Sequence, residues 1–135
     1  MISTKGRYAL RVMIDLAQHN TGEYISLKDI ATRQNISMKY LEIIVAGMNK
    51  SGMLLSQRGK LGGYRLARGL EDYTIGQILK CSEGSMVPVN CLEGDTNLCE
   101  HSGSCITLPM WQKLDRIMDD YLESITLADL LNGNV

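Results

Sequence analysis

The chain has 135 residues, of which 44% are hydrophobic, and these values suit one compact unit with a small appendage. No apolar run is long enough to cross a membrane, and the first twenty residues lack the unbroken apolar centre of a signal peptide. We therefore expect a cytoplasmic protein with no membrane partner. Thiols stay reduced in that compartment, which favours metal binding over disulfide formation for its four cysteines.

The net charge of -1 conceals a strong asymmetry. Residues 1–68 contain eleven Lys and Arg against four Asp and Glu, whereas residues 69–135 contain three against eleven. The first part therefore carries +7 and the second -8. A basic half joined to an acidic half indicates a polyanion-binding face and a separate part for oligomerisation or sensing. Chance segregation of charge in a short chain is the alternative.

Three helices are expected in the first fifty residues. The first begins at Ser3 or Thr4 and ends at 20–22, and the second begins at Ser26, with Asp29 placed as in a capping box. Ser37 begins the third, which ends at Gly52. The third helix has one apolar stripe, formed by Leu41, Ile44, Val45 and Met48. Two short helices, the second with a polar outer face, match a helix-turn-helix, although many helical hairpins look alike.

The stretch "MLLSQRGKLGGYRLAR" at 53–68 predicts a β-hairpin. Met53 and Leu55, then Tyr64 and Leu66, alternate with polar residues and are expected to face inward. The loop carries cations and glycines that allow a tight reversal and a close backbone approach: Arg58, Lys60, Gly62 and Gly63. A helix-turn-helix followed by a basic hairpin is a winged helix, in which the hairpin lies on the minor groove or the DNA backbone. An ordinary solvated hairpin is the alternative.

The remainder is expected to hold a short helix from Thr74, an aperiodic stretch and a long amphipathic helix from about Ile106. The apolar stripe of the long helix contains Met110, Leu114, Ile117, Met118, Tyr121, Leu122 and Ile125. Its opposite face is acidic, and Thr126 caps a final turn. The simplest partner for this stripe is the same helix of a second copy, and folding back onto its own domain is the alternative.

The predicted fold is mainly α with a small β-hairpin. We expect a winged helix-turn-helix DNA-binding domain over 1–81, a cysteine-bearing sensor loop over 82–105, and a dimerisation helix with a C-terminal turn over 106–135.

Four segments in order resemble a family of winged-helix bacterial regulators. They are "STKGRYAL" at 3–10, "ISMKYLE" at 36–42, "RGKLGGYRLAR" at 58–68 and "ITLADL" at 125–130. The family includes the iron–sulfur cluster regulator IscR, the nitric-oxide-sensing repressor NsrR and the cysteine-metabolism repressor CymR. The resemblance covers nearly the whole chain and implies a homodimer that binds a roughly palindromic double-stranded DNA operator.

The resemblance also implies groove contacts, from Ser37, Lys39, Tyr40, Glu42 and Ile43 in the third helix and from Arg58 in the wing. Glu42 would accept a hydrogen bond from a cytosine amino group. Ile43 stands where IscR-like members commonly have glutamine, so it could read only a thymine methyl. Packing between helices is an equal alternative for Tyr40.

Further contacts are expected outside the third helix. Lys5 and Arg7 are candidate phosphate contacts, and Lys60, Gly62 and Gly63 are candidate contacts in the wing.

Several family members hold an iron–sulfur cluster on three cysteines in this same loop, and Cys91, Cys99 and Cys105 match them. The first spacing is seven residues instead of the usual five. Thiolates are soft ligands suited to such clusters, and a two-iron two-sulfur cluster is favoured. The fourth ligand of IscR-like proteins falls on Leu108, which cannot bind iron.

The fourth ligand therefore stays open. His101 has the most suitable donor atom, and Glu100, Asp95, Glu93 or a group of the partner subunit's first helix are the other candidates. Zinc on the three cysteines and His101 is the main rival, although the paired C-x₂-C spacing of most structural zinc sites is absent. Disulfides or inert cysteines are a further alternative, and Cys81 is expected to be a small buried residue.

The leading hypothesis is a homodimeric DNA-binding transcriptional regulator, with repressor as the expected class, whose operator binding is modulated by an iron–sulfur cluster; the sequence does not determine whether it activates or represses. The alternative is a cluster-free or zinc-bound regulator controlled by thiol redox state or by an enzyme or effector partner. The sequence shows no nucleophile–base pair, phosphate-binding loop or paired carboxylates, so we do not expect an enzyme.

Overall fold

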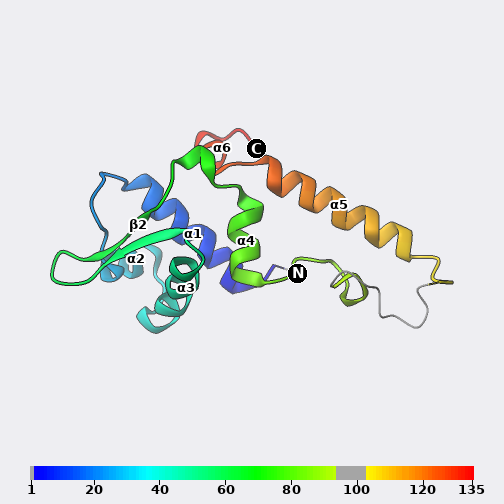
Figure 1. The fold of residues 1–135 in the computed structure, drawn as a ribbon, viewed down its shortest axis with the longest axis horizontal. Coiled ribbons are helices and arrows are strands. Elements are labelled where there is room, and N and C mark those ends of the chain that lie inside the picture. The colour runs from blue at the N-terminus through cyan, green and yellow to red at the C-terminus, as the bar shows by residue number, and fades with distance from the viewer. Residues whose placement is uncertain (1, 94–102) are drawn as a thin grey trace.

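The structure is a computed structural model that describes residues 2–93 and 103–135 (Figure 1). Its helices are α1 (Thr4–Gln18), α2 (Leu27–Gln34), α3 (Met38–Lys50), α4 (Ile75–Glu83), α5 (Leu108–Ser124) and α6 (Leu127–Asn132). Two strands, β1 (Leu54–Gln57) and β2 (Gly63–Leu66), form an antiparallel hairpin. Short 3₁₀ turns cover Leu70–Asp72 and Asn90–Leu92. The expected mainly helical fold with one small hairpin is confirmed.

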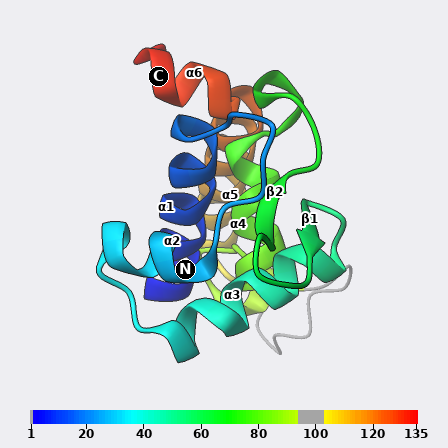
Figure 2. The same cartoon turned by 90° about the vertical axis from the view of Figure 1, so that its left-hand side faces the viewer.

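The core lies between α1, α2, α3, α4 and the base of the hairpin (Figure 2). It is built from the apolar stripe of each helix, as the 3.6-residue period predicts. Ala9, Val12 and Met13 of α1 are fully buried there. Ile125 and Leu127, near the C-terminus, are buried in the same core. The end of the chain thus packs on the helices that begin it.

Most of these helices have a side-chain N-cap at the residue that the sequence predicts. Ser26 accepts a hydrogen bond from the amide of Asp29, and Ser37 accepts one from Tyr40. Thr74 and Thr126 each form a reciprocal capping box. The first helix differs, because the side chain of Ser3 caps no amide of α1.

The hairpin corrects one expectation about which strand residues face inward. Leu54 is 2% exposed and pairs with Leu66 on the core side, whereas Leu55 is 40% exposed. Met53, which precedes the strand, is also buried, so two successive residues are buried before the exposed remainder of β1. The expected alternation from Met53 placed Leu55 on the inward face, and it is therefore wrong by one residue in β1, where Leu54 faces inward.

Helix α5 projects from the rest of the molecule: its N-terminal end is the outlying one, and its C-terminal end leads into α6 at the domain (Figure 1). The connection is a backbone ladder, in which Ile75 donates to Ile125 and Leu127 donates to Tyr73, at 2.8 and 2.9 Å. The first turn of α4 is thereby paired with the segment between α5 and α6. Among the described residues, no helix is long and apolar enough to span a membrane.

Candidate nucleic-acid interface and cysteine segment

The turn between α2 and α3 is fixed by Asp15, a fully buried carboxylate on α1. Arg33 donates two hydrogen bonds to it, at 3.0 and 2.7 Å, and Gln34 donates one at 2.9 Å. Burial alone would raise the pKa of Asp15. The hydrogen bonds from Arg33 and Gln34 and the charge of Arg33 outweigh burial, so the pKa lies below its usual value.

Arg11 extends this network, because its guanidinium donates to the side chain and the backbone carbonyl of Gln34. Asn35 follows with φ of 54°, the left-handed conformation that an asparagine tolerates at a helix end. The network therefore sets the end of α2 and, through Asn35, the direction in which α3 leaves. Asp15 and its partners were not among the residues singled out from the sequence.

Helix α3 has one buried and one exposed face, as its pattern predicts. Leu41, Ile44, Val45 and Met48 are buried. Lys39, Glu42 and Ile43 are exposed, and the apolar Ile43 is 53% exposed. Three types of group that read base edges in a major groove are thus present: a cation, a carboxylate and an aliphatic side chain.

Two other candidate residues of α3 are already engaged in the fold. The Tyr40 ring is half-buried and meets the Tyr8 ring edge-on, with ring centres 5.6 Å apart. Arg11 lies over the other ring of this pair, that of Tyr8, at 5.1 Å. The hydroxyl of Ser37 serves as the cap of α3. Tyr40 therefore has the interhelical packing that was its alternative role.

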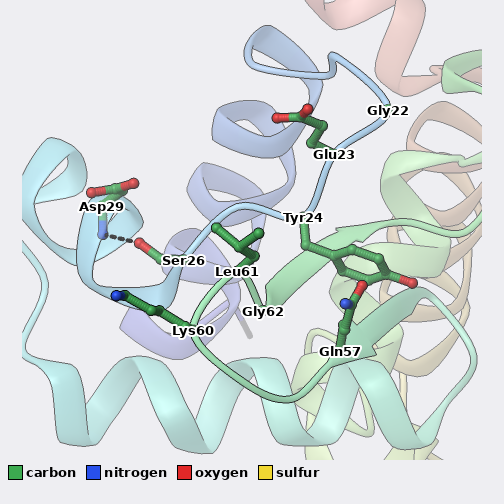
Figure 3. A pocket seen from close by; sticks show the side chains of 9 residues that line it. All are labelled: Gly22, Glu23, Tyr24, Ser26, Asp29, Gln57, Lys60, Leu61 and Gly62. Atoms are coloured by element: carbon green, nitrogen blue, oxygen red, sulfur yellow. Dashed lines mark hydrogen bonds between the residues drawn. The ribbon is translucent and has the colours of Figure 1, made fainter.

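The wing is the loop 58–62 between the strands, and its side chains are largely exposed. Arg58, Lys60 and Leu61 are all exposed, and Leu61 is 86% exposed. Figure 3 shows Lys60 directed toward the first turn of α2, across an open cleft of about 640 Å³. The cleft is polar and carries charges of both signs, because Glu23 and Asp29 also line it.

The two adjacent glycines of the wing are required by the protein's own backbone. A Cβ at Gly62 would lie 2.2 Å from the carbonyl oxygen of Gln57. Gly63 has φ of 150°, and a Cβ there would lie 2.0 Å from the carbonyl oxygen of Ile25. Ile25 and Tyr64 exchange backbone hydrogen bonds of 2.9 Å at this point. The close backbone approach expected of Gly62 and Gly63 thus occurs within the fold.

The first turn of α1 adds two cations to this end of the molecule. Arg7 is exposed and Lys5 is half-buried. Figure 2 shows the beginning of α1 and helix α3 at the same end of the domain. The first turn of α1, which contains Lys5 and Arg7, therefore lies at the end of the domain where α3 lies.

The cysteines are only partly described. Cys91 and Cys105 are unpaired and half-buried, and Cys81 is half-buried against the core. Cys99 and His101 lie outside the described residues, as do Asp95 and Glu100. Within 2–93 and 103–135, no three His, Cys, Asp or Glu side chains gather as a metal site.

Cys105 has a distinctive environment just before α5. Its Sγ lies 3.3 Å from the hydroxyl of Thr107. This hydrogen bond, with those of the Thr107 and Leu108 amides, lowers the pKa of the Cys105 thiol below its usual value. The thiolate is the form that binds metals and reacts, so the environment suits a ligand. Cys91 and Cys105 are soft donors on either side of residues 92–104, and their chemistry fits an iron–sulfur cluster or zinc.

Helix α5 carries an apolar stripe without a partner among the described residues. We call this the α5 stripe, and its members are Met110, Leu114, Ile117 and Tyr121. Ile117 and Tyr121 are 56% and 53% exposed. A second row, which includes Met118 and Leu122, is half-buried and turned toward the side of α5 that packs on α4. The expected single stripe is therefore divided between two faces.

Comparison with known proteins supports a DNA-binding role for this arrangement. The profile of the Rrf2 family, described as iron-dependent transcriptional regulators, matches residues 2–133. Protein rrf2 of Nitratidesulfovibrio vulgaris is 37% identical over 130 residues, which are 96% of this chain and 86% of that protein. The transcriptional regulator IscR of Vibrio campbellii is 35% identical over 134 residues, 98% of this chain and 78% of that protein.

Solved structures agree with the family and with the winged-helix fold. T. potens IscR has a TM-score of 0.77 and 38% identity, and covers 100% of this chain and 88% of its own. CymR, the global cysteine regulator of B. subtilis, has a TM-score of 0.79 and 36% identity, and covers 98% and 97%. These relatives are transcriptional regulators, which confirms the expectation that the chain is not an enzyme. The chain belongs to the Rrf2 family of winged-helix, DNA-binding transcriptional regulators.

Proposed function

We propose that this regulator binds a palindromic operator as a homodimer, with α3 in the major groove and the wing on the adjacent minor groove or backbone. The observation that carries the proposal is the exposed face of α3, with Lys39, Glu42 and Ile43, set beside an exposed basic wing. A half of the chain with a charge of +7 supplies the attraction to phosphate that DNA binding requires.

The proposal is tested by selecting duplexes from a random-sequence library and measuring affinity by fluorescence anisotropy. Arg58→Ala should weaken binding to the selected duplex by about 1–3 kcal/mol if its guanidinium reaches a base or the minor groove. Lys60→Ala, the comparison in the same loop, should weaken binding uniformly across sequences and lower the salt slope by about 1. Unchanged affinity in both variants would remove the wing from the mechanism.

The homodimer is proposed to form through the α5 stripe. Four large apolar side chains on one face of a helix lose the hydrophobic contribution of burial unless another surface covers them. A second α5 is self-complementary under two-fold symmetry, and a two-fold dimer matches two operator half-sites. Sedimentation of the purified protein should therefore give a dimer.

An iron–sulfur cluster on Cys91, Cys99 and Cys105 is proposed to modulate operator binding. The lowered pKa of Cys105 and the iron-dependent description of the family support it. A cluster with incomplete cysteine ligation would be open to loss or attack, which suits a sensor of iron or oxidants. Cys91 and Cys105 would hold it from the two ends of the segment, with His101 as the proposed fourth ligand. Protein purified without oxygen should be coloured and contain iron and sulfide.

Thiol-based or zinc-dependent control is the second candidate, and the environment of Cys105 favours it. A thiol with a lowered pKa near the surface oxidises readily even without metal. In this case the protein is colourless, and treatment with peroxide changes its DNA affinity. Zinc at one ion per chain in colourless protein would replace the cluster hypothesis with a zinc site. A pull-down that recovers a specific enzyme with metal-independent DNA binding would favour an effector partner.

A further inference from the structure

Helix α1 begins without a cap of its own, and a carboxylate from α4 takes that role. The oxygen Oε1 of Glu83 accepts a hydrogen bond from the Ser3 amide at 2.7 Å and one from the Ser3 hydroxyl at 2.8 Å. It also accepts one from the Gly6 amide at 3.1 Å. A carboxylate here satisfies amides that have no partner in the helix and faces the positive end of the helix dipole.

Gly6 makes this close approach possible. A Cβ at position 6 would lie 2.2 Å from Oε1 of Glu83, although the backbone of Gly6 is ordinary helix. Glycine is disfavoured inside helices, so its presence in the first turn needs a reason other than conformation. The space taken by the Glu83 carboxylate is that reason. Gly6 and Glu83 therefore act as a matched pair.

The pair holds the turn that carries Lys5 and Arg7. Its other end is anchored in α4, which is itself tied to α5 through its N-cap residue and a lysine of its last turn. There, Thr74 donates to Glu123 at 2.9 Å and Lys80 donates to Glu123 at 3.1 Å. Helix α4 thus packs along α1, reaches the first turn of α1 through Glu83, and is joined to α5 through Thr74 and Lys80.

We propose that Glu83 is a positioning residue for DNA binding: its carboxylate, fitted against Gly6, holds the first turn of α1 so that Lys5 and Arg7 meet the phosphate backbone. This rests on the proposed DNA contacts of α1. The direction of the change in DNA affinity distinguishes positioning by Glu83 from a simple effect of its charge. Removing a negative charge near DNA should strengthen binding, whereas loss of positioning should weaken it.

The test uses Glu83→Gln in the full-length protein, with a fluorescein-labelled mixed-sequence duplex of about 30 base pairs at about 0.05 M salt. The expected result is binding about three- to tenfold weaker than that of the wild type, because the phosphate contacts lose their orientation. Gly6→Ala is the second variant, since it displaces the carboxylate while raising helix propensity, and it should weaken binding in the same direction. Glu71→Gln, an exposed acid on the turn before α4, is the charge-matched control and should bind as tightly as the wild type or tighter.

A double-mutant cycle separates positioning from general destabilisation. In an Arg7→Ala background, Glu83→Gln should weaken binding by a smaller factor than it does in the wild-type background, because one of the two contacts that Glu83 positions is already gone. If the wild type binds the duplex and Glu83→Gln binds it equally tightly or more tightly, the role of Glu83 is overturned, and the DNA contacts of α1 are not. Full additivity with Arg7→Ala would also overturn the role of Glu83. A wild-type protein that binds no duplex would overturn the proposed DNA contacts of α1, and the role of Glu83 with them.

Discussion

At the scale of single residues, two buried polar groups stabilise the frame of the end that we propose binds DNA. The Tyr73 hydroxyl is fully buried and joins three backbone groups: it donates to the Met53 carbonyl at 2.6 Å and accepts from the Ala67 and Arg68 amides at 2.9 and 3.1 Å. It thereby ties both ends of the hairpin to the segment before α4. Asp15 does the same for the junction of α1, α2 and α3.

Tyr73→Phe removes this hydroxyl and leaves a buried carbonyl and two amides without their partner. We expect the free energy of unfolding to fall by about 1–3 kcal/mol, since unsatisfied buried groups retain their desolvation cost. Urea denaturation measures the change. Tyr24→Phe is the control, because its ring lies outside the α5 stripe, is only half-buried and shows no hydrogen bond of its hydroxyl among the described residues. Equal stability of the two variants would contradict the role assigned to Tyr73.

Asp15→Asn should lower the free energy of unfolding at neutral pH by about 2–3 kcal/mol, through weaker hydrogen bonds to Arg33 and Gln34. The folded pKa of Asp15 is depressed, so its contribution is fully present above the unfolded pKa of about 3.9. It is lost as pH falls through the lower folded pKa. The difference between wild type and variant should therefore shrink below about pH 4 in urea denaturation series. A difference that is constant with pH would exclude ionised Asp15 as the cause.

At the scale of elements, one face of α5 packs on α4 and another face carries the exposed α5 stripe. Lys80 of α4 pairs with Asp119 at 2.5 Å and with Glu123 at 3.1 Å, and both acids raise the pKa of Lys80. These pairs are partly exposed, so each contributes little alone. Together they orient the C-terminal part of α5 on α4. The α5 stripe lies on the other face and stays available for another chain.

Ile117→Glu places a carboxylate in the centre of the α5 stripe. The dissociation constant of the proposed dimer should rise at least about a hundredfold, because each dimer would bury two unpaired charges. Sedimentation velocity across a concentration series measures this effect. Gln112→Glu adds the same charge outside the stripe and should leave the dimer intact. A dimer that survives Ile117→Glu would show that another surface forms the interface.

At the scale of the whole molecule, the basic DNA-binding end and the acidic C-terminal half are joined by α4 and by the core that they share. Ile125 and Leu127 are buried with Val12 and Met13, so the chain returns along α5 to the domain from which it left after α4 (Figure 1). The elements that flank the segment 84–107 therefore pack on the same body as α1 and α3.

Cys91→Ser should abolish the colour of anaerobically purified protein if the proposed cluster is present, since serine is a poor ligand for iron–sulfur clusters. Iron and sulfide analysis with an absorbance spectrum checks this outcome. Cys81→Ser is the matched control, because Cys81 packs against the core and should leave the iron content unchanged. Full iron content in Cys91→Ser would remove Cys91 from the ligand set.

Much of the fold is predictable because its signals are local. Ser26, Ser37 and Thr74 begin their helices as expected, since each cap bonds an amide only three residues away. The face of β1 was predicted one residue out of step because core packing, and not the strand itself, selects which side of Leu54 and Leu55 is inward. Glu83 could not be found from sequence, since its contacts with α1 span 77 and 80 residues.

The amino-acid sequence by itself determined the helices, the basic hairpin, the charge division and the family motifs, because each depends on short-range pattern and composition. Only the tertiary structure decided the network around Asp15, the backbone role of Gly62 and Gly63, and the division of the α5 apolar residues into two faces. It also paired Glu83 with Gly6. The physical reason is common to all four: they depend on which distant segments pack together, and such contacts follow from the burial of the entire core.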